Sequence, residues 1–496
     1  MSMIRVENLT FSYPGSYDVI FENVNFQIDT DWRLGFVGRN GRGKTTFLNL
    51  LIGKYEYSGK IQSSVQFEYF PYYVDDKSRL TRNILSEVCP TVEKWELLRE
   101  LSYLEVHEGV LWRPFSTLSN GEQTKVLLAA LFLNKGNFLL IDEPTNHLDA
   151  KARETVAAYL KRKKGFILVS HDRYFLDACV DHILSINRSN IEVQSGNFSI
   201  WFSNFHNQQE FELSENSKLN KEIVRLKKTA RQSKSWSDKV EKTKNGTRIS
   251  GVKADKGYIG HKSAKMMKRS KTIEARQKQV IEEKSKLLKN IEVVEDLKLT
   301  TFHYFSDTLV TFSDIVPIFD GKDICNPISF EIKQGERIAL DGNNGSGKTS
   351  LLKLLIGQKI EHRGTLKIGS GLLLSYVPQD ASTLNGYLSE FAKNNNIDES
   401  LFKAVLRKMD FSRIQFEKRM EYFSEGQKKK VLIAKSLCEQ AHIYIWDEPL
   451  NYIDIYSRIQ IENLIRKFSP TMIFVEHDLA FRNNIATKVV RVAAKD

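Results

Sequence analysis

Short apolar runs bounded by polar turns recur along the chain and predict the strands of its sheets. Apolar and polar residues alternate over residues 4–11, 309–312 and 328–332, which is typical of strands with one buried face. Continuous apolar runs predict strands buried on both faces at Phe138–Ile141, Phe166–Val169, Ile443–Trp446 and Met472–Val475. Helices are predicted over Gln123–Leu133 and Gln427–Leu437. Strands that alternate with helices indicate an α/β core with a mostly parallel sheet.

The motifs of the first half of the chain recur in the same order in the second half. GRNGRGKT at 38–45 recurs as GNNGSGKT at 342–349, an offset of 304. SNGEQ at 119–123 recurs as SEGQ at 424–427, DEPTNHLD at 142–149 as DEPLNYID at 447–454, and SHD at 170–172 as EHD at 476–478, at offsets of 305, 305 and 306. This regularity indicates a duplicated domain. We predict a first domain over residues 1–204, a linker over 205–297 and a second domain over 298–496.

The linker carries the basic charge of the chain. Residues 218–289 contain 23 Lys and Arg against 7 Asp and Glu, a net charge of +16, whereas the whole chain has a net charge of +12. Apolar residues spaced by seven predict two antiparallel helices zipped together: Leu219, Leu226 and Val240, then Ile273, Val280, Leu287 and Val294. Glycines at 246, 251, 257 and 260 predict a loop between these helices. A helix of ~33 residues would extend ~50 Å.

The glycine-rich motif GxxxxGK[ST] predicts two nucleotide sites. Its backbone N–H groups surround phosphates at a helix N-terminus, where the helix dipole favours anions. Lys44 and Lys348 are expected to reach the β- and γ-phosphates, and Thr45 and Thr349 to ligate Mg²⁺. ATP and Mg²⁺ are therefore the expected cofactors.

Acidic residues and a histidine follow the apolar strands in both halves. Asp142 and Asp447 are expected to hold Mg²⁺ through water, and the neighbouring Glu143 and Glu448 to polarise the attacking water as general bases. His171 and His477 are candidates for contacting the γ-phosphate. A lone histidine at a strand end is more often a surface or core residue, but the duplicated position favours the functional interpretation.

These motifs resemble those of ATP-binding-cassette (ABC) domains over both halves. The resemblance implies that SNGEQ and SEGQ are signature motifs, each reading the γ-phosphate held by the opposite domain, so that one chain sandwiches two ATPs as a monomer. The loop at Gly38–Thr46 would face Ser424–Gln427, and the loop at Gly342–Ser350 would face Ser119–Gln123. Asp149 and Asp454 look like the residues of the family's D-loop at that interface.

Two positions distinguish the halves. Gln379 resembles the glutamine of the family's Q-loop, whereas the first half has Tyr72 there, which argues against symmetric Mg²⁺ coordination. Tyr13 resembles the aromatic residue that stacks on adenine; the alternative is an ordinary strand aromatic, and the second half has no clear equivalent.

Residue chemistry and resemblance together define the candidate site. The catalytic candidates are Glu143, Glu448, His171 and His477. The ATP-binding candidates are Tyr13, Gly38, Asn40, Gly41, Gly43, Lys44, Thr45, Thr46, Gly342, Asn344, Gly345, Gly347, Lys348, Thr349, Ser350, Ser119, Gly121, Glu122, Ser424, Gly426 and Gln427. The metal-binding candidates are Thr45, Asp142, Thr349, Gln379 and Asp447.

Tandem cassettes joined by a basic helical linker resemble the ABC-F class of translation factors, and among them the Lsa-type antibiotic-resistance proteins. The segments that carry this resemblance are TDWRLGFVGRNGRGKTTFL, LSNGEQTKVLLAALFL and IDEPTNHLDAKARE. It implies binding in the ribosomal exit site, where the linker would contact large-subunit rRNA, displace the P-site tRNA and dislodge lincosamides, streptogramin A compounds and pleuromutilins. ATP binding would permit docking and hydrolysis would release the protein. The candidate contacts in the linker loop are Lys244, Arg248, Lys253 and Tyr258.

Three alternatives share some of these features. A housekeeping ABC-F factor for translation or ribosome assembly would share every motif, and a transporter ATPase subunit would need a membrane partner but no basic linker. A chromosome or DNA-repair ATPase would carry its coiled coils inside a cassette. The longest apolar run, Val126–Leu133, is far shorter than the ~20 residues that span a bilayer, and MSMIRVENLTF contains no run that resembles the core of a signal peptide. Four scattered cysteines predict reduced thiols and a cytoplasmic protein.

Overall fold

The computed structural model describes residues 2–14, 19–134, 136–146, 148–186, 191–242 and 297–495, together with scattered residues between 261 and 279. The chain divides into two units. One contains both copies of the repeat, here called cassette 1 (residues 2–201) and cassette 2 (residues 297–495), and the other contains the linker that follows Trp201.

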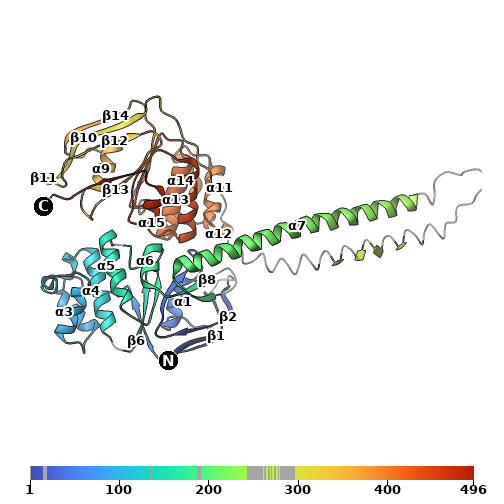
Figure 1. Ribbon diagram of the computed structural model, residues 1–496, viewed down its shortest axis with the longest axis horizontal. Helices are drawn as coiled ribbons and strands as arrows, with labels where there is room; N and C mark the ends of the chain where they lie inside the picture. The colour runs from blue at the N-terminus through green and yellow to red at the C-terminus, as the bar shows by residue number, and fades with distance from the viewer. Residues whose placement is uncertain are drawn as a thin grey trace, which may run out of the picture. The chain divides into compact units, whose positions relative to one another are not determined.

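Cassette 1 contains an antiparallel sheet of order β2-β1-β4 and a mainly parallel sheet of order β5-β6-β7-β3-β8-β9, in which only β9 is antiparallel to its neighbour. Its strands are β1 (Met3–Ser12), β2 (Val19–Asp29), β3 (Arg33–Val37), β4 (Ser58–Gln62), β5 (Gln66–Phe70), β6 (Asn137–Asp142), β7 (Phe166–Val169), β8 (His182–Ile186) and β9 (Ile191–Ser195). Its helices are α1 (Lys44–Leu51), α2 (Thr81–Val88), α3 (Lys94–Tyr103), α4 (Asn120–Leu133), α5 (Ala150–Lys161) and α6 (Arg173–Cys179), with 3₁₀ turns at Glu108–Trp112 and Phe115–Thr117. Helix α4 packs against α2 and α3, and α5 packs against α6; Figure 1 shows α3 and α4 next to each other.

Cassette 2 repeats this plan. Its antiparallel strands are β10 (Thr308–Phe319), β11 (Lys322–Asp323), β12 (Ile328–Lys333) and β14 (His362–Ile368), and its parallel strands are β13 (Arg337–Asp341), β15 (Leu374–Val377), β16 (Ile443–Asp447), β17 (Met472–Val475) and β18 (Lys488–Arg491). Its helices are α9 (Lys348–Leu355), α10 (Leu388–Asn394), α11 (Glu399–Lys408), α12 (Arg413–Glu417), α13 (Glu425–Cys438), α14 (Ile455–Phe468) and α15 (Leu479–Ile485), with a 3₁₀ turn at Met420–Tyr422.

The two parallel sheets confirm the predicted α/β duplication. The order β15-β16-β17-β13-β18 in cassette 2 matches β5-β6-β7-β3-β8 in cassette 1. Every strand and helix that the apolar pattern predicts within the two cassettes is present, and the residues of the continuous runs in β6, β7, β16 and β17 are buried on both faces. In β1 the buried residues alternate as predicted: Ile4, Val6, Leu9 and Phe11. Because the motif residues follow the carboxyl ends of these strands, the fold collects them at one edge of each sheet.

The linker begins in a long helix, α7 (Phe198–Lys242), of 45 residues. At 1.5 Å per residue it extends ~68 Å, longer than the ~50 Å expected from the sequence. The residues described between 261 and 279 are also helical, as the second linker helix requires. The predicted seam at 273, 280, 287 and 294, and the predicted loop at about 242–262, lie almost wholly outside the described residues.

Among the described residues, no helix combines the length and the apolar character needed to cross a membrane. The four cysteines are free, as predicted, and three of them are buried: Cys89, Cys179 and Cys325.

A buried polar trio in cassette 1 joins α3 to the end of α5. Glu100 is 2% exposed and accepts hydrogen bonds from Tyr159 (2.8 Å) and from the ammonium of Lys163. Burial raises the pKa of Glu100, but the hydrogen bonds and charge of Lys163 and Tyr159 outweigh it, so the pKa lies below its ordinary value. At an offset of 305 the three counterparts in cassette 2 are apolar: Val405, Leu464 and Phe468. The fold therefore does not itself require the polar trio.

We expect Glu100→Val to lower the free energy of unfolding by ~1–3 kcal/mol, because it leaves a buried Tyr159 hydroxyl and a mostly buried Lys163 ammonium without their partner. The triple variant Glu100→Val/Tyr159→Leu/Lys163→Phe, which copies cassette 2, should recover stability to within ~1 kcal/mol of wild type. Urea unfolding followed by circular dichroism measures both. Because the pKa of Glu100 is lowered, its contribution is complete above the ordinary glutamate pKa of 4.5 and is lost as the pH falls through the folded-state pKa. If Glu100→Val is as stable as wild type at neutral pH, the expected loss of stability is contradicted.

Candidate functional site

The two glycine-rich loops end in the same backbone conformation. Gly43 and Gly347 precede α1 and α9 with φ of 93° and 91°, a left-handed conformation that a side chain disfavours. A Cβ on Gly43 would also lie 2.6 Å from the Ile20 side chain. These glycines allow each loop to turn directly into its helix, with Lys44 or Lys348 as the first helical residue. We call Gly38–Thr46 loop 1 and Gly342–Ser350 loop 2.

Each loop holds the ammonium of its own lysine. Lys44 Nζ donates to the Gly38 carbonyl at 2.7 Å, and Lys348 Nζ donates to the Gly342 and Asn343 carbonyls at 2.7 and 2.8 Å. Burial lowers the pKa of both lysines, and neighbouring carboxylates oppose this shift, chiefly Asp454 for Lys44 and Glu448 for Lys348. Both loops therefore hold a largely desolvated cation, to which an anionic phosphate would bind strongly.

The aspartates at the ends of β6 and β16 differ between the cassettes. Asp142 Oδ2 accepts hydrogen bonds from Thr45 Oγ1 at 2.8 Å and from Tyr69 Oη at 2.9 Å. Asp447 is fully buried, and among the described residues Thr349 is the donor that acts on its carboxylate. Burial raises the pKa of Asp447 to about 6, and the hydrogen bond from Thr349 opposes this shift. A buried carboxylate with so few donors fits a site for a bound cation, because the ion would supply further partners.

The Q-loop position adds to this difference. Gln379 hydrogen-bonds to Glu448 and lines the same cavity as loop 2. Tyr72, at the corresponding position of cassette 1, is 40% exposed, and it is Tyr69, three residues earlier, that contacts Asp142. The expectation that the two metal sites are not equivalent thus has a structural basis in these residues.

The two candidate general bases share an unusual backbone conformation. Glu143 and Glu448 have φ of 50° and 45°, in the left-handed region. Their backbone N–H groups donate to Val169 and Val475 at 2.9 Å in both cassettes, which ties each glutamate to the neighbouring parallel strand. A non-glycine residue in this conformation costs ~1–2 kcal/mol and marks positions where the side chain matters more than the backbone energy.

The environment of Glu143 favours its neutral form. Burial raises its pKa to about 8, the nearby Asp142 adds to this, and Lys44 opposes it. His171 Nε2 lies 3.3 Å from Glu143 Oε1 and 3.0 Å from Asn40 Oδ1. Burial, followed by the charge of Lys44, lowers the pKa of His171 well below its ordinary value.

Glu448 is held in the opposite state. Burial raises its pKa, but the hydrogen bonds and charge of His477, with donors from Gln379 and Asn451, outweigh it and lower the pKa to about 2. Asn451 Nδ2 donates to Glu448 Oε2 at 2.7 Å, and His477 Nε2 lies 3.5 Å from Glu448 Oε1. Glu448 is therefore ionised at neutral pH, the form that a general base requires.

The signature motifs begin helices α4 and α13. Ser119 and Ser424 cap these helices and form capping boxes with Glu122 and Gln427. Within the unit that contains both cassettes, loop 2 and signature residues of cassette 1 line one cavity of about 940 Å³. The candidate residues that meet there are Ser119, Gly121, Glu122, Asn344, Gly345, Gly347, Lys348, Thr349, Ser350, Gln379, Glu448 and His477. We call this cavity site 2; it has the head-to-tail composition expected from the sequence.

Loop 1 lies against the signature motif of cassette 2, Ser424–Gln427. We call the place where they meet site 1. Asn40 Nδ2 donates to the Tyr452 carbonyl of cassette 2 at 2.7 Å. A Cβ on Gly426 would lie 2.4 Å from that carbonyl and 3.1 Å from Asn40 Nδ2, so only glycine fits at this point of the signature. Asp410 forms ion pairs with Arg39 (3.7 Å) and Arg42 (3.8 Å) of loop 1. The counterparts in loop 2, Asn343 and Ser346, are neutral and cannot form such pairs.

Two arginines of the site were missed by the sequence analysis. Arg153 and Arg458, one turn into α5 and α14, pair with Asp172 (2.9 Å) and Asp478 (2.7 Å), directly after the two histidines. Each also donates to a carbonyl of the preceding D-loop. Their common offset of 305 is the signal that could have identified them.

The acidic residues of the D-loops lie near the loop of the opposite cassette, as expected: Asp149 lines the cavity of site 2, and the charges of Asp149 and Asp454 act on Lys348 and Lys44. Asp149 and Asp454 cap α5 and α14, and Asp454 pairs with Lys430 of its own cassette at 2.8 Å. The hydrogen bond from loop 1 reaches the Tyr452 carbonyl instead.

The remaining candidates lie beside the loops or outside the described residues. Tyr13 is 38% exposed, and its hydroxyl lies 2.8 Å from Thr46 Oγ1 in loop 1. Its ring is thus next to the phosphate loop, as adenine stacking would require, and the adenine assignment stays a prediction. The linker-loop candidates Lys244, Arg248, Lys253 and Tyr258 lie outside the described residues.

Known proteins share this architecture. The sequence model of the family described as "ABC transporter" matches residues 21–146 and 325–451. The "Ribosome protection protein VmlR" of Bacillus subtilis is 27% identical over 489 residues, which cover 95% of this chain and 83% of that protein. The "ATP-binding protein Uup" of Buchnera aphidicola subsp. Schizaphis graminum is 26% identical over 512 residues, which cover 98% of this chain and 80% of that protein.

Solved structures agree in fold. The archaeal ribosome recycling factor aABCE1, in its complex with the archaeal ribosomal stalk protein aP1, superposes with a TM-score of 0.64 at 21% identity and covers 98% of this chain and 87% of its own. At this identity the likeness concerns the fold alone. The two matches of the family model cover half of the sequence, one in each cassette. The chain therefore belongs to the ABC transporter family: its two tandem ABC domains make it an ATPase, and the relatives it resembles over nearly its whole length include a ribosome protection protein and an ATP-binding protein.

Proposed function

We propose that this protein binds the ribosome in an ATP-dependent manner and dislodges lincosamide, streptogramin A and pleuromutilin antibiotics from the peptidyl transferase centre. In this proposal it works in the cytoplasm as a monomer, its linker reaches large-subunit rRNA from the exit site, and the linker displaces the P-site tRNA. The observation that carries the proposal is a basic face on the linker helices of an ATPase.

That face is made of described, exposed residues. On α7 the basic residues recur every three or four positions and so share one side of the helix: Lys218, Lys221, Arg225 and Lys228. Between 261 and 279 the exposed residues again include a basic series: Lys265, Lys268, Arg269, Lys271 and Arg276. A row of basic side chains along one side of a helix can pair with the regularly spaced phosphates of rRNA.

ATP would occupy both sites. Lys44 and Lys348 would exchange their loop carbonyls for the β- and γ-phosphates, and the loop N–H groups would cradle the same phosphates. The signature serines, Ser424 in site 1 and Ser119 in site 2, would meet the γ-phosphate from the opposite cassette. A γ-phosphate in site 2 would thereby draw the 940 Å³ cavity closed, and closure would be the state that docks.

We place the main hydrolytic activity in site 2. Mg²⁺, when bound, would be held by Thr349, Asp447 and Gln379 and would neutralise charge on the phosphates. Glu448, ionised and oriented by Asn451, would polarise the attacking water. In site 1, Thr45 and Asp142 would play the metal-binding part, but Asp142 already accepts two hydrogen bonds and Glu143 is held neutral.

Ribosome co-sedimentation over a series of salt concentrations tests the proposal. The logarithm of the association constant should fall linearly with the logarithm of the salt concentration. Neutralising Lys218, Lys221 and Lys228 to glutamine should reduce the slope by about 1 for each lysine that contacts a phosphate. Lys418→Gln, an exposed lysine of cassette 2, is the matched control and should leave the slope unchanged. A protein that pellets with membranes and not with ribosomes would favour a transporter subunit instead.

A housekeeping role in translation or ribosome assembly is the second candidate. The identity to Uup, 26%, is almost as high as the 27% identity to the ribosome protection protein, so the two roles are supported about equally by similarity. Inhibitory concentrations of the three drug classes, with and without the gene in a drug-sensitive Gram-positive host, separate them. Protection supports resistance; unchanged inhibitory concentrations with growth or translation defects in a deletion strain support the housekeeping role.

A further inference from the structure

Helix α3 of cassette 1 presents exposed aromatic residues and arginines in alternation. Trp95, Arg99 and Tyr103 are spaced by four and so lie along one side of the helix, and they are 56%, 47% and 44% exposed. The Arg99 guanidinium lies 5.3 Å from the centre of the Trp95 ring, and the Arg162 guanidinium lies 5.0 Å from that of Tyr103. We call these four residues the α3 ladder.

The ladder is not needed for packing, as the second copy of the fold shows. Helix α11 corresponds to α3 at an offset of 305, and its buried positions remain apolar: Phe402 and Leu406 for Leu97 and Leu101. At the ladder positions cassette 2 has Ser400, Ala404 and Lys408. Single exposed aromatic side chains are ordinary on a protein surface, and cassette 2 has some of its own, such as Phe319. What distinguishes α3 from α11 is that two aromatic rings and an arginine lie together along one side of the helix, and this grouping points to a role in binding.

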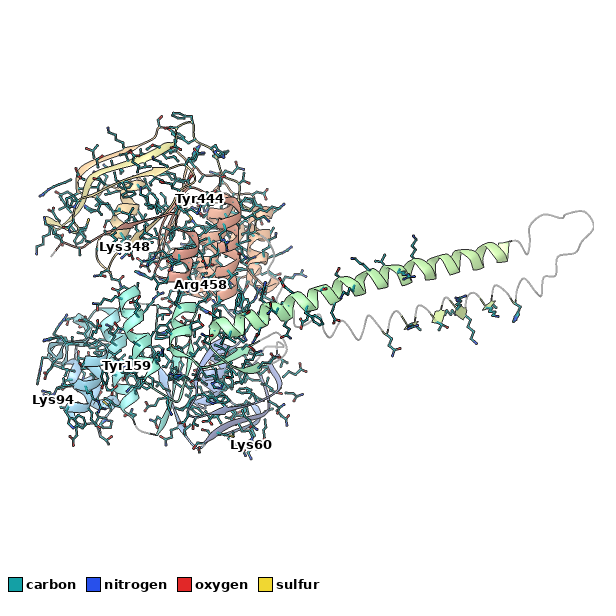
Figure 2. The ribbon with its side chains drawn as sticks, viewed as in Figure 1. Lys60, Lys94, Tyr159, Lys348, Tyr444 and Arg458 are labelled. Atoms are coloured by element: carbon teal, nitrogen blue, oxygen red, sulfur yellow. The ribbon has the colours of Figure 1, made fainter. Side chains whose placement is uncertain are left out.

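The polar trio beneath α3 supports the same conclusion. Glu100 holds Lys163, the neighbour of Arg162, against the buried face of α3, and Tyr159 completes the trio. Figure 2 labels Tyr159, which is 1% exposed, and Lys94, the first residue of α3, whose side chain is 61% exposed at the outer edge of the cassette. The trio thus fixes the end of α5 beside α3 and sets Arg162 over Tyr103, whereas cassette 2 packs this region with apolar residues.

The chemistry of the ladder fits single-stranded RNA. Aromatic rings and guanidinium planes both stack on unpaired bases, and guanidinium groups also bind phosphates. Four residues advance ~6 Å along a helix, so Trp95 and Tyr103 are ~12 Å apart along the axis. This spacing exceeds the ~3.4 Å between stacked neighbours and suits bases that are splayed apart. Lys161 and Lys164, both exposed beside Arg162, add positive charge.

Acidic groups are also present and argue against a purely electrostatic site. Glu93 accepts the Trp95 indole N–H at 2.6 Å, Glu100 lies 3.4 Å from Arg99, and Glu96 is half-buried on the same helix. We infer that the α3 ladder binds unpaired bases of RNA by stacking, as a contact separate from the linker. Insofar as that RNA belongs to the ribosome, the inference rests on the proposed function.

The test replaces the three ladder residues of α3 by those of cassette 2 in the full-length chain and keeps Arg162: Trp95→Ser/Arg99→Ala/Tyr103→Lys. One positive charge is lost and one is gained, so a contact based on charge alone predicts no change. We expect the affinity for a short single-stranded oligoadenylate RNA to fall by about tenfold or more. Affinity for heparin, a polyanion without bases, should stay the same. The control Phe319→Ser removes an aromatic side chain that is 68% exposed in cassette 2 and should bind RNA as wild type does.

Further measurements decide the outcome. Ultraviolet cross-linking of the oligoadenylate, followed by peptide mapping, should identify the peptide that contains Trp95 and Tyr103. The ATPase rate and thermal unfolding of the triple variant should match wild type, which excludes misfolding as the cause. Unchanged oligoadenylate binding would overturn the inference, and so would a parallel loss of heparin binding. A triple variant that keeps oligoadenylate binding but loses ribosomes would assign the ladder to a protein partner and overturn it as well.

The two proposals can fail separately. The linker glutamine variant should keep RNA cross-linking at α3 even where its salt slope changes. If wild type does not co-sediment with ribosomes but the ladder still cross-links to oligoadenylate, the proposed function fails and the ladder stands.

Discussion

Replacing Glu143 and Glu448 together by glutamine is expected to lower the rate of ATP hydrolysis by about 10²-fold or more while leaving ATP binding intact. The physical reason is that the amide cannot accept a proton from the attacking water, a contribution that is typically worth 10²- to 10⁴-fold. The lysines and backbone N–H groups that would hold the phosphates are unchanged, so the variant should stay closed on ATP and accumulate on ribosomes. Phosphate release and co-sedimentation with ATP measure the two effects.

The single variants distinguish the two sites. Glu448→Gln should lose more activity than Glu143→Gln, because Glu448 is ionised and held by Asn451 and Gln379, whereas Glu143 is held neutral. In site 1, Asp142 also already accepts two hydrogen bonds. Equal losses would mean that the difference between the sites disappears when ATP binds. A double variant that hydrolyses ATP at the wild-type rate would show that neither glutamate is the general base.

The second large effect is expected in the linker. Deleting residues 243–260 should abolish or redirect drug protection while ATP hydrolysis stays close to wild type. Helix α7 separates these two activities, since its 45 residues extend ~68 Å from Phe198, next to cassette 1 in the chain, to Lys242. A change beyond Lys242 leaves the loops, strands and signature helices of the ATP sites untouched. Inhibitory concentrations for the three drug classes, measured beside ATPase rates, give the result.

Point variants refine this prediction. Lys244→Ala and Tyr258→Ala should have smaller effects that depend on the drug, if phosphate contacts or stacking matter. A serine at Thr243, which keeps the hydroxyl, serves as the control. Full protection by a deletion variant that still binds ribosomes would exclude the loop as the effector and leave the helices or cassettes in that role.

Much of the fold and of the ATP sites followed from local patterns. Continuous apolar runs ending in Asp142 or Asp447 correctly predicted buried parallel strands, because only a strand covered on both faces tolerates such a run. The resemblance to ABC domains implied that each loop faces the signature motif of the other half, and site 2 has that composition. Motifs of this kind are predictable because backbone geometry and phosphate chemistry restrict which residues can stand at each position.

Features that depend on tertiary contacts were not predictable in this way. Nothing near Tyr69 in the sequence indicates that its hydroxyl reaches Asp142, 73 positions away. The pairing of Arg39 and Arg42 with Asp410 and the trio of Glu100 likewise join distant segments. For the last two, the informative signal was a difference between the duplicated halves, such as Val405 opposite Glu100, and its meaning becomes clear only when the neighbouring residues are known.

The left-handed backbone at Glu143 and Glu448 has a consequence for how such a duplicated enzyme can evolve. Glycine would remove ~1–2 kcal/mol of backbone strain at each position. A half that no longer needed its catalytic glutamate would therefore become more stable through a single substitution by glycine. Both halves nevertheless carry glutamate there. Glutamate in place of glycine therefore costs the folded chain stability at two positions. Cassette 1, whose metal site is the less favourable of the two, keeps glutamate at position 143 despite this cost.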